Sequence, residues 1–313
     1  MPLDDLATDG WMKQCILITP SAEYEQWLVA IQSATKLAGK EMVLHHGLEL
    51  DRGAGFDRCV FVSTNKKFLE PSADAEVCVI ATGLSGAINK TEELTGGSGL
   101  YAVIDTGALV VEALTYPGAR VITDATIRSA PVPVLLLHDL SVEPPSITRQ
   151  HPSSDLERAG QQALSLFENG PPLVGATTEF MPEIFFIETR KRELRPRETL
   201  LDVTGGPRLL VNGPQITLTP GLWQATIRFS VDEDSARYGF RFEWGSMEDV
   251  TAVNITPKAS GVFDLTIQHP FVQAARSEMR VHLTEGALHG EFEFLGVRVV
   301  KIAEATPATV LAN

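Results

Sequence analysis

The sequence has 313 residues, 44% of them hydrophobic and 21% charged, so it is long enough for two folded domains and too apolar to be disordered. Its formal net charge of -14 at pH 7 repels a phosphate backbone, which argues against nucleic acid as a partner. The one basic cluster, residues 190–197, lies in a Pro-containing stretch that is typical of a solvated linker.

Cysteine usage and the N-terminus indicate the compartment. Cys15, Cys59 and Cys78 each lie inside an apolar run without CxxC spacing, so we interpret them as buried side chains in a reducing environment. The N-terminus lacks the positive flank and apolar stretch of a signal peptide, and no window of eighteen residues is continuously apolar. We therefore expect a cytoplasmic protein with no membrane span.

Short apolar runs alternate with helical stretches through the first 140 residues. This alternation is typical of a mostly parallel sheet covered by helices on both faces. Strands are predicted at residues 14–19, 42–46, 59–63, 76–81, 119–124 and 133–138. Helices are predicted at residues 21–37, where apolar residues recur at helical spacing, and at residues 99–114, which are apolar nearly all round. We interpret residues 1–140 as a Rossmann-like α/β domain.

The next segment, residues 141–199, changes character. It begins with the prolines of a connector and continues with a helical pattern at residues 156–169, which Ser154 or Asp155 can cap. Gly170 and the two prolines after it end the pattern. We expect a linker with a bridging helix.

From residue 200 to the C-terminus the hydrophobic period changes from helical to two. Apolar and polar residues alternate strictly along residues 222–231 and 238–244, which predicts a hairpin with one apolar side. The alternation continues at residues 262–268, 278–285 and 291–300. About eight short strands of this kind favour a separately folded, jelly-roll-like antiparallel β-sandwich over residues 200–313.

The aromatic residues of the hairpin have two interpretations. Phe229, Phe240 and Phe242 lie on the apolar side and are expected in the core. Trp223 and Trp244 lie at strand ends beside glycines, where each ring either closes the edge of the sandwich or forms a stacking platform for a sugar.

Several residues of the last third carry a resemblance: Leu201, Asp202, Thr204, Gly205, Gly213, Pro214, Pro220, Gly221, Trp223, Arg280, His289, Gly290 and Glu291. This part resembles carbohydrate-binding β-sandwich modules of alphaproteobacterial proteins of polysaccharide synthesis and surface glycosylation. The resemblance implies a glycan ligand but transfers no set of ligand-binding residues. The candidate ligand-binding residues are Trp223, Tyr238, Arg241, Trp244 and His289. Residues 232–234, an acidic DED run, are either a calcium ligand set or a solvated hairpin tip.

A second candidate site lies in the first domain, because open parallel sheets bind ligands at the carboxyl ends of their strands. The glycine-rich and hydroxyl-rich stretch after residue 81 offers an anion or nucleotide loop made of Gly83, Ser85, Gly96, Gly97 and Ser98. It matches neither GxGxxG nor the Walker A pattern. Otherwise, the stretch after Thr82 and residues 51–58 are expected to be loops or short turns.

Catalytic and metal sites have little support. A nucleophilic Ser85 would need a histidine and an acid, for which His138 and Asp139 are conceivable partners. His45 and His46 are adjacent in a predicted strand and so point to opposite sides, which argues against a shared metal.

Together these patterns favour a non-catalytic protein without cofactor or metal, which recognises a glycan or a protein of the polysaccharide machinery. Two alternatives stay open. One is an enzyme that uses the first domain to act on a nucleotide sugar or another activated sugar. The other is a structural interaction module that forms homo-oligomers or docks a partner protein.

Overall fold

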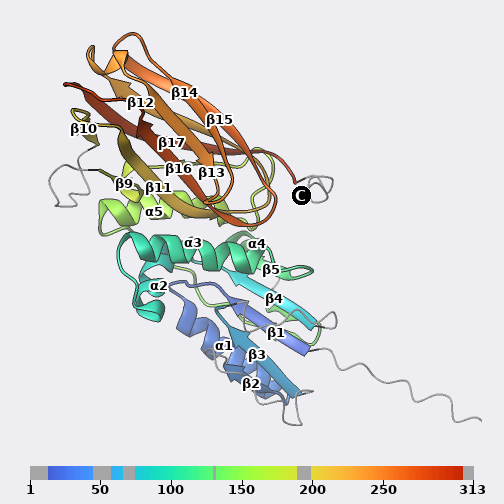
Figure 1. The fold of residues 1–313 in the computed structure, drawn as a ribbon. Helices are drawn as coiled ribbons and strands as arrows, with labels where there is room; N and C mark the ends of the chain where they lie inside the picture. The colour runs from blue at the N-terminus through green and yellow to red at the C-terminus, as the bar shows by residue number, and fades with distance from the viewer. Residues whose placement is uncertain (1–12, 45–57, 66–74, 130–131, 189–198, 306–313) are drawn as a thin grey trace, which may run out of the picture.

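A five-stranded, all-parallel sheet forms the first part of the protein (Figure 1). The computed structural model describes residues 13–44, 58–65, 75–129, 132–188 and 199–305. The strand order is β2 (Glu41–Leu44), β3 (Cys59–Ser63), β1 (Lys13–Ile18), β4 (Ala75–Ala81) and β5 (Arg120–Thr123). Helix α1 (Tyr24–Leu37) packs on one face, and α2 (Ala87–Thr95) and α3 (Leu100–Leu114) pack on the other.

The sheet is buried on both faces because successive residues of its strands enter different cores. Cys15 and Leu17 of β1 pack in the core that contains α3, whereas Ile16 and Ile18 pack in the core that contains α1. This arrangement explains the continuous apolar runs of the sequence. Trp27 of α1 is fully buried and donates its indole N–H to Thr82 Oγ1 at 2.9 Å.

Two expectations for the first part are corrected. The run predicted at residues 133–138 is not a strand of the parallel sheet. It forms β6 (Val134–Leu137), which pairs antiparallel with β7 (Leu140–Val142) and packs on the α1 side. The stretch after Thr82 is not all loop, because it contains a short 3₁₀ turn, Leu84–Gly86, and the helix α2. A further short helix, α4 (Asp124–Ser129), follows β5.

The helix expected in the connecting segment is present as α5 (Asp155–Leu164), with Ser154 Oγ accepting a hydrogen bond from Glu157 N at 3.1 Å. The same segment also contains two strands, β8 (Thr177–Phe180) and β9 (Phe186–Ile187). Both strands pair with strands beyond residue 200. The antiparallel part of the fold therefore begins before residue 200.

Two five-stranded antiparallel sheets make up that part (Figure 1). The first antiparallel sheet has the order β10 (Leu200–Asp202), β17 (Glu291–Ala303), β12 (Gly221–Val231) and β15 (Gly261–Phe271), with β8 paired to β17. The second has the order β14 (Val250–Ile255), β13 (Phe240–Gly245), β16 (Ala275–Leu283), β11 (Arg208–Leu218) and β9. Their inner faces contact each other, for example where the ring centroids of Phe229 and Phe242 lie 4.9 Å apart.

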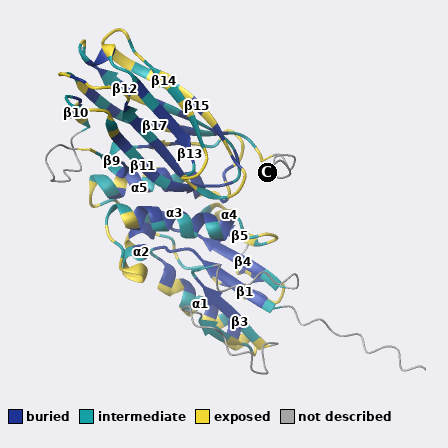
Figure 2. Ribbon diagram, viewed as in Figure 1, coloured by how far each residue is buried: buried dark blue, intermediate teal, exposed yellow. Residues whose placement is uncertain are grey.

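The parallel and antiparallel parts share one core. Figures 1 and 2 show α3, largely buried, between the parallel sheet and the antiparallel strands. A single cluster of buried apolar side chains runs from β1 and β4 through α3 and α5 into both antiparallel sheets. The helix comes close to β11 at Gly107, where an added Cβ would lie 3.7 Å from Ile216 Cγ2. The expected α/β part and β-rich part are therefore both present, joined by a packed interface.

Within the described part of the chain, no single helix is long and apolar enough to cross a membrane. The stretches Leu84–Thr95 and Leu100–Leu114 reach that length and composition only as a pair, with a bend of 104° between them. His45, His46 and the basic cluster at residues 190–197 lie outside the described residues.

Candidate functional site

The two candidate tryptophans lie in the core, which corrects the stacking-platform interpretation. Trp223 and Trp244 are each 0% exposed. Trp223 donates its indole N–H to Thr219 O at 2.8 Å, and the Trp244 ring makes an edge contact with Phe271 at 6.0 Å. A sugar stacks on the open face of a ring, and neither ring has one. Both instead close the ends of the apolar interior.

Tyr238 and His289 lie in loops at one end of the antiparallel sheets. The Tyr238 hydroxyl accepts a hydrogen bond from Leu288 N at 3.1 Å, and His289 Nε2 lies 3.2 Å from Asp234 Oδ1. Asp232, the first residue of the acidic run, accepts a hydrogen bond from Ser235 N at 2.7 Å. Within the part of the chain that the structure describes, no three His, Cys, Asp or Glu residues are placed to hold a metal ion.

Arg241, the remaining candidate, lies on the outer face of the second antiparallel sheet. Phe240, Phe242 and Trp244 of β13 point into the core, so Arg241 and Glu243 point outward. The strand register places Phe186, Asn212, Arg280, Glu243 and Ala252 in one row across the sheet, from β9 to β14. His282, Arg241 and Asn254 form the next row.

We call this surface the polar face, which consists of Phe186, Asn212, Arg241, Glu243, Asn254, Glu278, Arg280 and His282. Its centre is a network of ion pairs around Glu243. Arg241 Nε lies 2.7 Å from Glu243 Oε1, and Arg280 Nη1 lies 3.4 Å from Glu243 Oε2. Arg280 also pairs with Glu278. The network holds both guanidinium groups in fixed positions while 44% of the Arg241 side chain and 23% of the Arg280 side chain stay exposed.

The ionisation of the network follows from these contacts. Burial by itself would raise the pKa of Glu243, but the hydrogen bond from Arg241 and the nearby His282 and Arg280 outweigh it and hold that pKa below its usual value. Burial likewise opposes the charge on Arg280, yet hydrogen bonds to Glu278 and Glu243 raise its pKa. The Glu243 carboxylate and the Arg280 guanidinium are therefore charged at neutral pH.

The polar face also has unused hydrogen-bonding capacity and an aromatic edge. Asn212 Oδ1 and His282 Nε2 are buried side-chain atoms with no hydrogen-bond partner among the described residues. At the β9 edge, the ring centroids of Phe186 and Tyr101 lie 6.4 Å apart, and Tyr101, a residue of α3, is 63% exposed. Of these residues, only Arg241 is a candidate ligand-binding residue from the sequence, and Arg280 carries only the resemblance. The outward alternation along β13 and β16 was visible in the sequence, but the register that aligns the strands was not.

The expected anion loop is not assembled as one site. Gly83 follows β4, whereas Gly96, Gly97 and Ser98 follow α2, whose nine residues separate the two groups by about 13 Å. The backbone N–H groups of Gly83 and Gly97 already donate to Asp124 Oδ1 and Thr95 Oγ1. Ser85 is held by Gln150 N, which donates to Ser85 Oγ at 3.1 Å. The N–H groups of Gly83 and Gly97 that a phosphate would need are therefore already bonded to oxygens of the protein.

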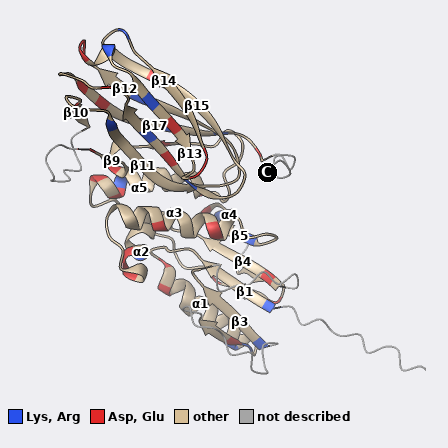
Figure 3. Ribbon diagram, viewed as in Figure 1, with Lys and Arg blue, Asp and Glu red and all other residues tan. Residues whose placement is uncertain are grey.

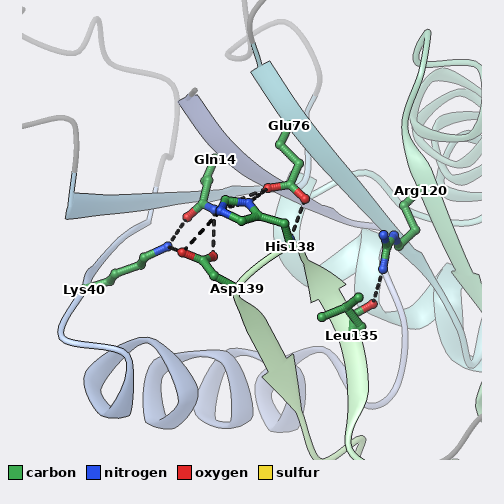
Figure 4. A network of polar contacts seen from close by, with 7 residues as sticks. All are labelled: Gln14, Lys40, Glu76, Arg120, Leu135, His138 and Asp139. Atoms are coloured by element: carbon green, nitrogen blue, oxygen red, sulfur yellow. Dashed lines mark hydrogen bonds and ion pairs between the residues drawn. The ribbon is translucent and has the colours of Figure 1, made fainter. Parts of the chain in front are cut away.

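The conceivable triad of Ser85, His138 and Asp139 is also corrected. Figure 4 shows His138 and Asp139 in a polar cluster at the amino end of the parallel sheet. His138 Nδ1 lies 2.6 Å from Glu76 Oε2, and Glu76 is near the start of β4. Ser85 follows the other end of β4, whose seven residues span about 20 Å. A nucleophile and a base at opposite ends of one strand cannot share a proton.

The cluster in Figure 4 has a structural role. Gln14 Nε2 donates to Asp139 Oδ1 at 2.8 Å, and Lys40 forms an ion pair with Asp139. Burial by itself would raise the pKa of Asp139, but the hydrogen bonds from Lys40 and Gln14 and the nearby Lys40 and His138 outweigh it and hold that pKa below its usual value. Arg120, which belongs to β5, donates a hydrogen bond from Nη1 to Leu135 O at 3.2 Å. The cluster ties the β6–β7 hairpin to β1, β4 and β5.

No protein-family model matches the chain, and no curated protein matches it. Among solved structures, it is similar to TmCBM61 in complex with β-1,4-galactotriose, at 8% identity over 34% of this chain and 83% of that chain, with a TM-score of 0.26. The xylan-binding module CBM15 gives 15% identity, 34% and 78% coverage and a TM-score of 0.25.

Over a longer stretch, the chain is similar to the Glycosylation Associate Protein (Gap123) complex from Streptococcus agalactiae. The alignment has 11% identity, covers 84% of this chain and 50% of that chain, and has a TM-score of 0.28. TM-scores this low assign neither a family nor a function to the chain.

Proposed function

We propose that the protein is a non-catalytic glycan-recognition or assembly protein of bacterial polysaccharide or surface-glycan machinery. In this proposal the antiparallel part acts as a jelly-roll-like sandwich that binds saccharide, and a Rossmann-like α/β part supports it in the cytoplasm. The observation that carries the proposal is the polar face, with its ordered donors and acceptors beside the Phe186–Tyr101 edge.

The chemistry of the polar face suits sugar hydroxyl groups. Guanidinium groups supply several donors in a fixed plane, while carboxylate and amide oxygens accept, so each hydroxyl can both donate and accept. The ion pairs fix the arginines before a ligand arrives, which reduces the side-chain entropy lost on binding. An exposed aromatic residue such as Tyr101 offers apolar area for the C–H surface of a sugar ring.

The distribution of charge agrees with an uncharged or weakly charged saccharide. Figure 3 shows that the positions of basic and acidic residues are interspersed along the antiparallel strands and do not gather in a region of one sign. In the polar face, Glu243 and Glu278 balance Arg241 and Arg280. The face therefore favours hydrogen bonding over long-range attraction of an anion.

The test is a glycan array followed by calorimetric titration of the intact protein with the saccharides that bind. Hydrogen bonds to charged groups contribute about 1.5 to 3 kcal/mol, so Arg280→Ala is expected to weaken binding at least about tenfold. Tyr101→Ala is expected to weaken it as well without disturbing the ion pairs. Arg228→Ala, which removes an exposed arginine from the outer face of the first antiparallel sheet, is the matched control and should leave affinity unchanged.

Two results would refute the proposal. One is the absence of saturable saccharide binding by the folded, intact protein. The other is equal affinity of the parent, Arg280→Ala and Tyr101→Ala proteins for every saccharide that binds.

A further inference from the structure

A pocket of about 330 Å³ lies beyond the carboxyl end of β4, and none of its lining residues belongs to the polar face. One wall is the turn that contains Leu84 and Ser85, which directly follows the strand. The other walls are α5, the 3₁₀ turn after it, and the extended segment of residues 143–152. This volume is at the lower end of the range for small-molecule sites, which is about 300 to 1,000 Å³.

The strand order explains why a pocket occurs at this place. The chain leaves β1 toward β3 and β2, but it leaves β4 toward β5 on the other side, so the two loops diverge. Such a point of divergence opens a crevice at the carboxyl ends of parallel strands, where ligands of open α/β sheets bind.

The extended segment of residues 143–152 crosses this crevice and is anchored to both loops. Thr148 N donates to Glu23 Oε1 at 2.9 Å, after β1, and Gln150 N donates to Ser85 Oγ at 3.1 Å, after β4. From the opposite wall, Gln161 of α5 donates its side-chain amide to Ser85 O. Ser85 is thus fixed from both sides at the rim of the pocket.

Two guanidinium groups line the pocket, although the chain as a whole has a net charge of -14. Arg149, His151 and Arg158 line it, and Glu168 is the one acidic residue among the described residues of the lining. Arg158 Nη1 lies 2.9 Å from Asp155 Oδ1, and its other N–H groups have no partner among the residues that the structure describes. Two guanidinium groups with free donors are well suited to an anion with three oxygens, such as a phosphate.

The rest of the lining is neutral and rich in hydrogen-bonding groups. Gln150, Gln161 and Gln162 supply amides, and Ser85 and Ser165 supply hydroxyls. These groups match a ligand that carries several hydroxyls. The volume of the pocket and its two arginines together indicate a ligand made of a single sugar unit that carries one phosphate.

We propose that this pocket binds the phosphomonoester of a monosaccharide, with Arg149 and Arg158 on the phosphate and the glutamines on the sugar hydroxyls. The site is separate from the polar face, and the inference does not rest on the function proposed for that face.

The test is calorimetric titration of the intact protein with glucose 1-phosphate, galactose 1-phosphate and mannose 1-phosphate, compared with inorganic phosphate and with free glucose. At least one hexose phosphate is expected to bind with saturation and more tightly than inorganic phosphate, and glucose is expected to bind weakly or not at all. The double variant Arg149→Gln/Arg158→Gln should lose at least tenfold in affinity for that hexose phosphate. Both side chains are exposed, so the variant should keep the melting temperature of the parent.

Two control variants separate this site from the rest of the molecule. Arg228→Gln removes an exposed arginine elsewhere and should bind the hexose phosphate as the parent does. Arg280→Ala should also bind it normally, even if it loses saccharide binding at the polar face. The inference is overturned if none of the three hexose phosphates saturates, if the double variant binds as tightly as the parent, or if Arg280→Ala abolishes binding.

Discussion

At the scale of single residues, the exposure of each aromatic side chain depends on which elements pack over it. Phe229, Phe240 and Phe242 were predicted in the core from strand alternation, and all three are 0% exposed. Trp223 and Trp244 belong to the same alternation, but their position at strand ends left their exposure open. Packing in the shared core decided it, because Trp244 of the second antiparallel sheet contacts Phe271 of the first and both indoles are 0% exposed.

The buried cysteines give a prediction at this scale. Burial raises the pKa of the Cys15 thiol to about 11 and that of the Cys78 thiol to about 12. An unperturbed thiol has a pKa of about 8.5, so at pH 8 these two side chains hold almost no thiolate in the folded protein. We expect Ellman's reagent at pH 8 to leave Cys15 and Cys78 unmodified in the native protein and to modify all three cysteines in denaturant.

The same shifts have a consequence for stability. A raised thiol pKa means that the folded state favours the protonated thiols. The stability that these thiols contribute is therefore complete below about pH 8.5, and it is lost as the pH rises toward their pKa values in the folded protein.

In the labelling experiment, rapid modification of three thiols per native chain would contradict the burial of Cys15 and Cys78. Cys78→Ala serves as the control, since it should leave the native count unchanged.

At the scale of elements, long periodic patterns were predicted better than short ones. The strands β1, β3 and β4 and the helices α1 and α3 lie within a few residues of their predicted positions. The apolar run of β6 was assigned to the wrong sheet, because a short apolar run does not distinguish a strand of a parallel sheet from one of a hairpin. Strands β8 and β9 have only four and two residues, which is too short for a periodic signal.

The packing of α5 gives a prediction for this scale. Gly160 lets α5 approach α2 and α3 closely, since a Cβ there would lie 2.6 Å from Ile88 Cδ1 and 2.9 Å from Val103 Cγ2. Overpacking of a filled core costs about 1 to 3 kcal/mol. Gly160→Val is therefore expected to lower the free energy of unfolding by about 2 kcal/mol in urea titration.

A matched control is Gly206→Ala, where an added Cβ meets nothing within 4 Å. This variant should change the free energy of unfolding by less than about 0.5 kcal/mol. If Gly160→Val unfolded at the same urea concentration as the parent, the close contact between α5 and its neighbours would be incorrect.

At the scale of the whole molecule, a cut in the chain at residue 200 would divide a packed interface. Residues 200–313 alone would lack β8 and β9, which pair with β17 and β11. They would also expose Ile216, which is 0% exposed beneath α3. Unpaired strand edges and exposed apolar area both reduce stability and promote aggregation.

This arrangement predicts the behaviour of fragments. A fragment of residues 173–313, which retains β8 and β9, should melt at a higher temperature than a fragment of residues 200–313, as measured by circular dichroism. Light scattering should show more self-association for the shorter fragment. Equal melting temperatures for the two fragments would mean that β8 and β9 contribute nothing to the fold. The intact chain is expected to unfold in one transition, because a single core joins its parts.

The sequence by itself determined the long strands and helices, which of their faces are apolar, and that Cys15, Cys78 and most aromatic residues are buried, whereas Cys59 is only partly buried. These properties repeat every two or 3.6 residues, so they can be read from neighbours along the chain. It also placed Arg241 on an outward face of its strand.

Only the tertiary structure decided which outward residues lie together. The polar face joins Phe186, Asn212, Glu243 and Arg280 from four strands, and the pocket at Ser85 joins a turn, an extended segment and a helix. Likewise, it separated Ser85 from His138 by the length of β4. The physical reason is that strand register and helix docking are set by contacts between residues far apart in the chain, and local periodicity carries no information about them.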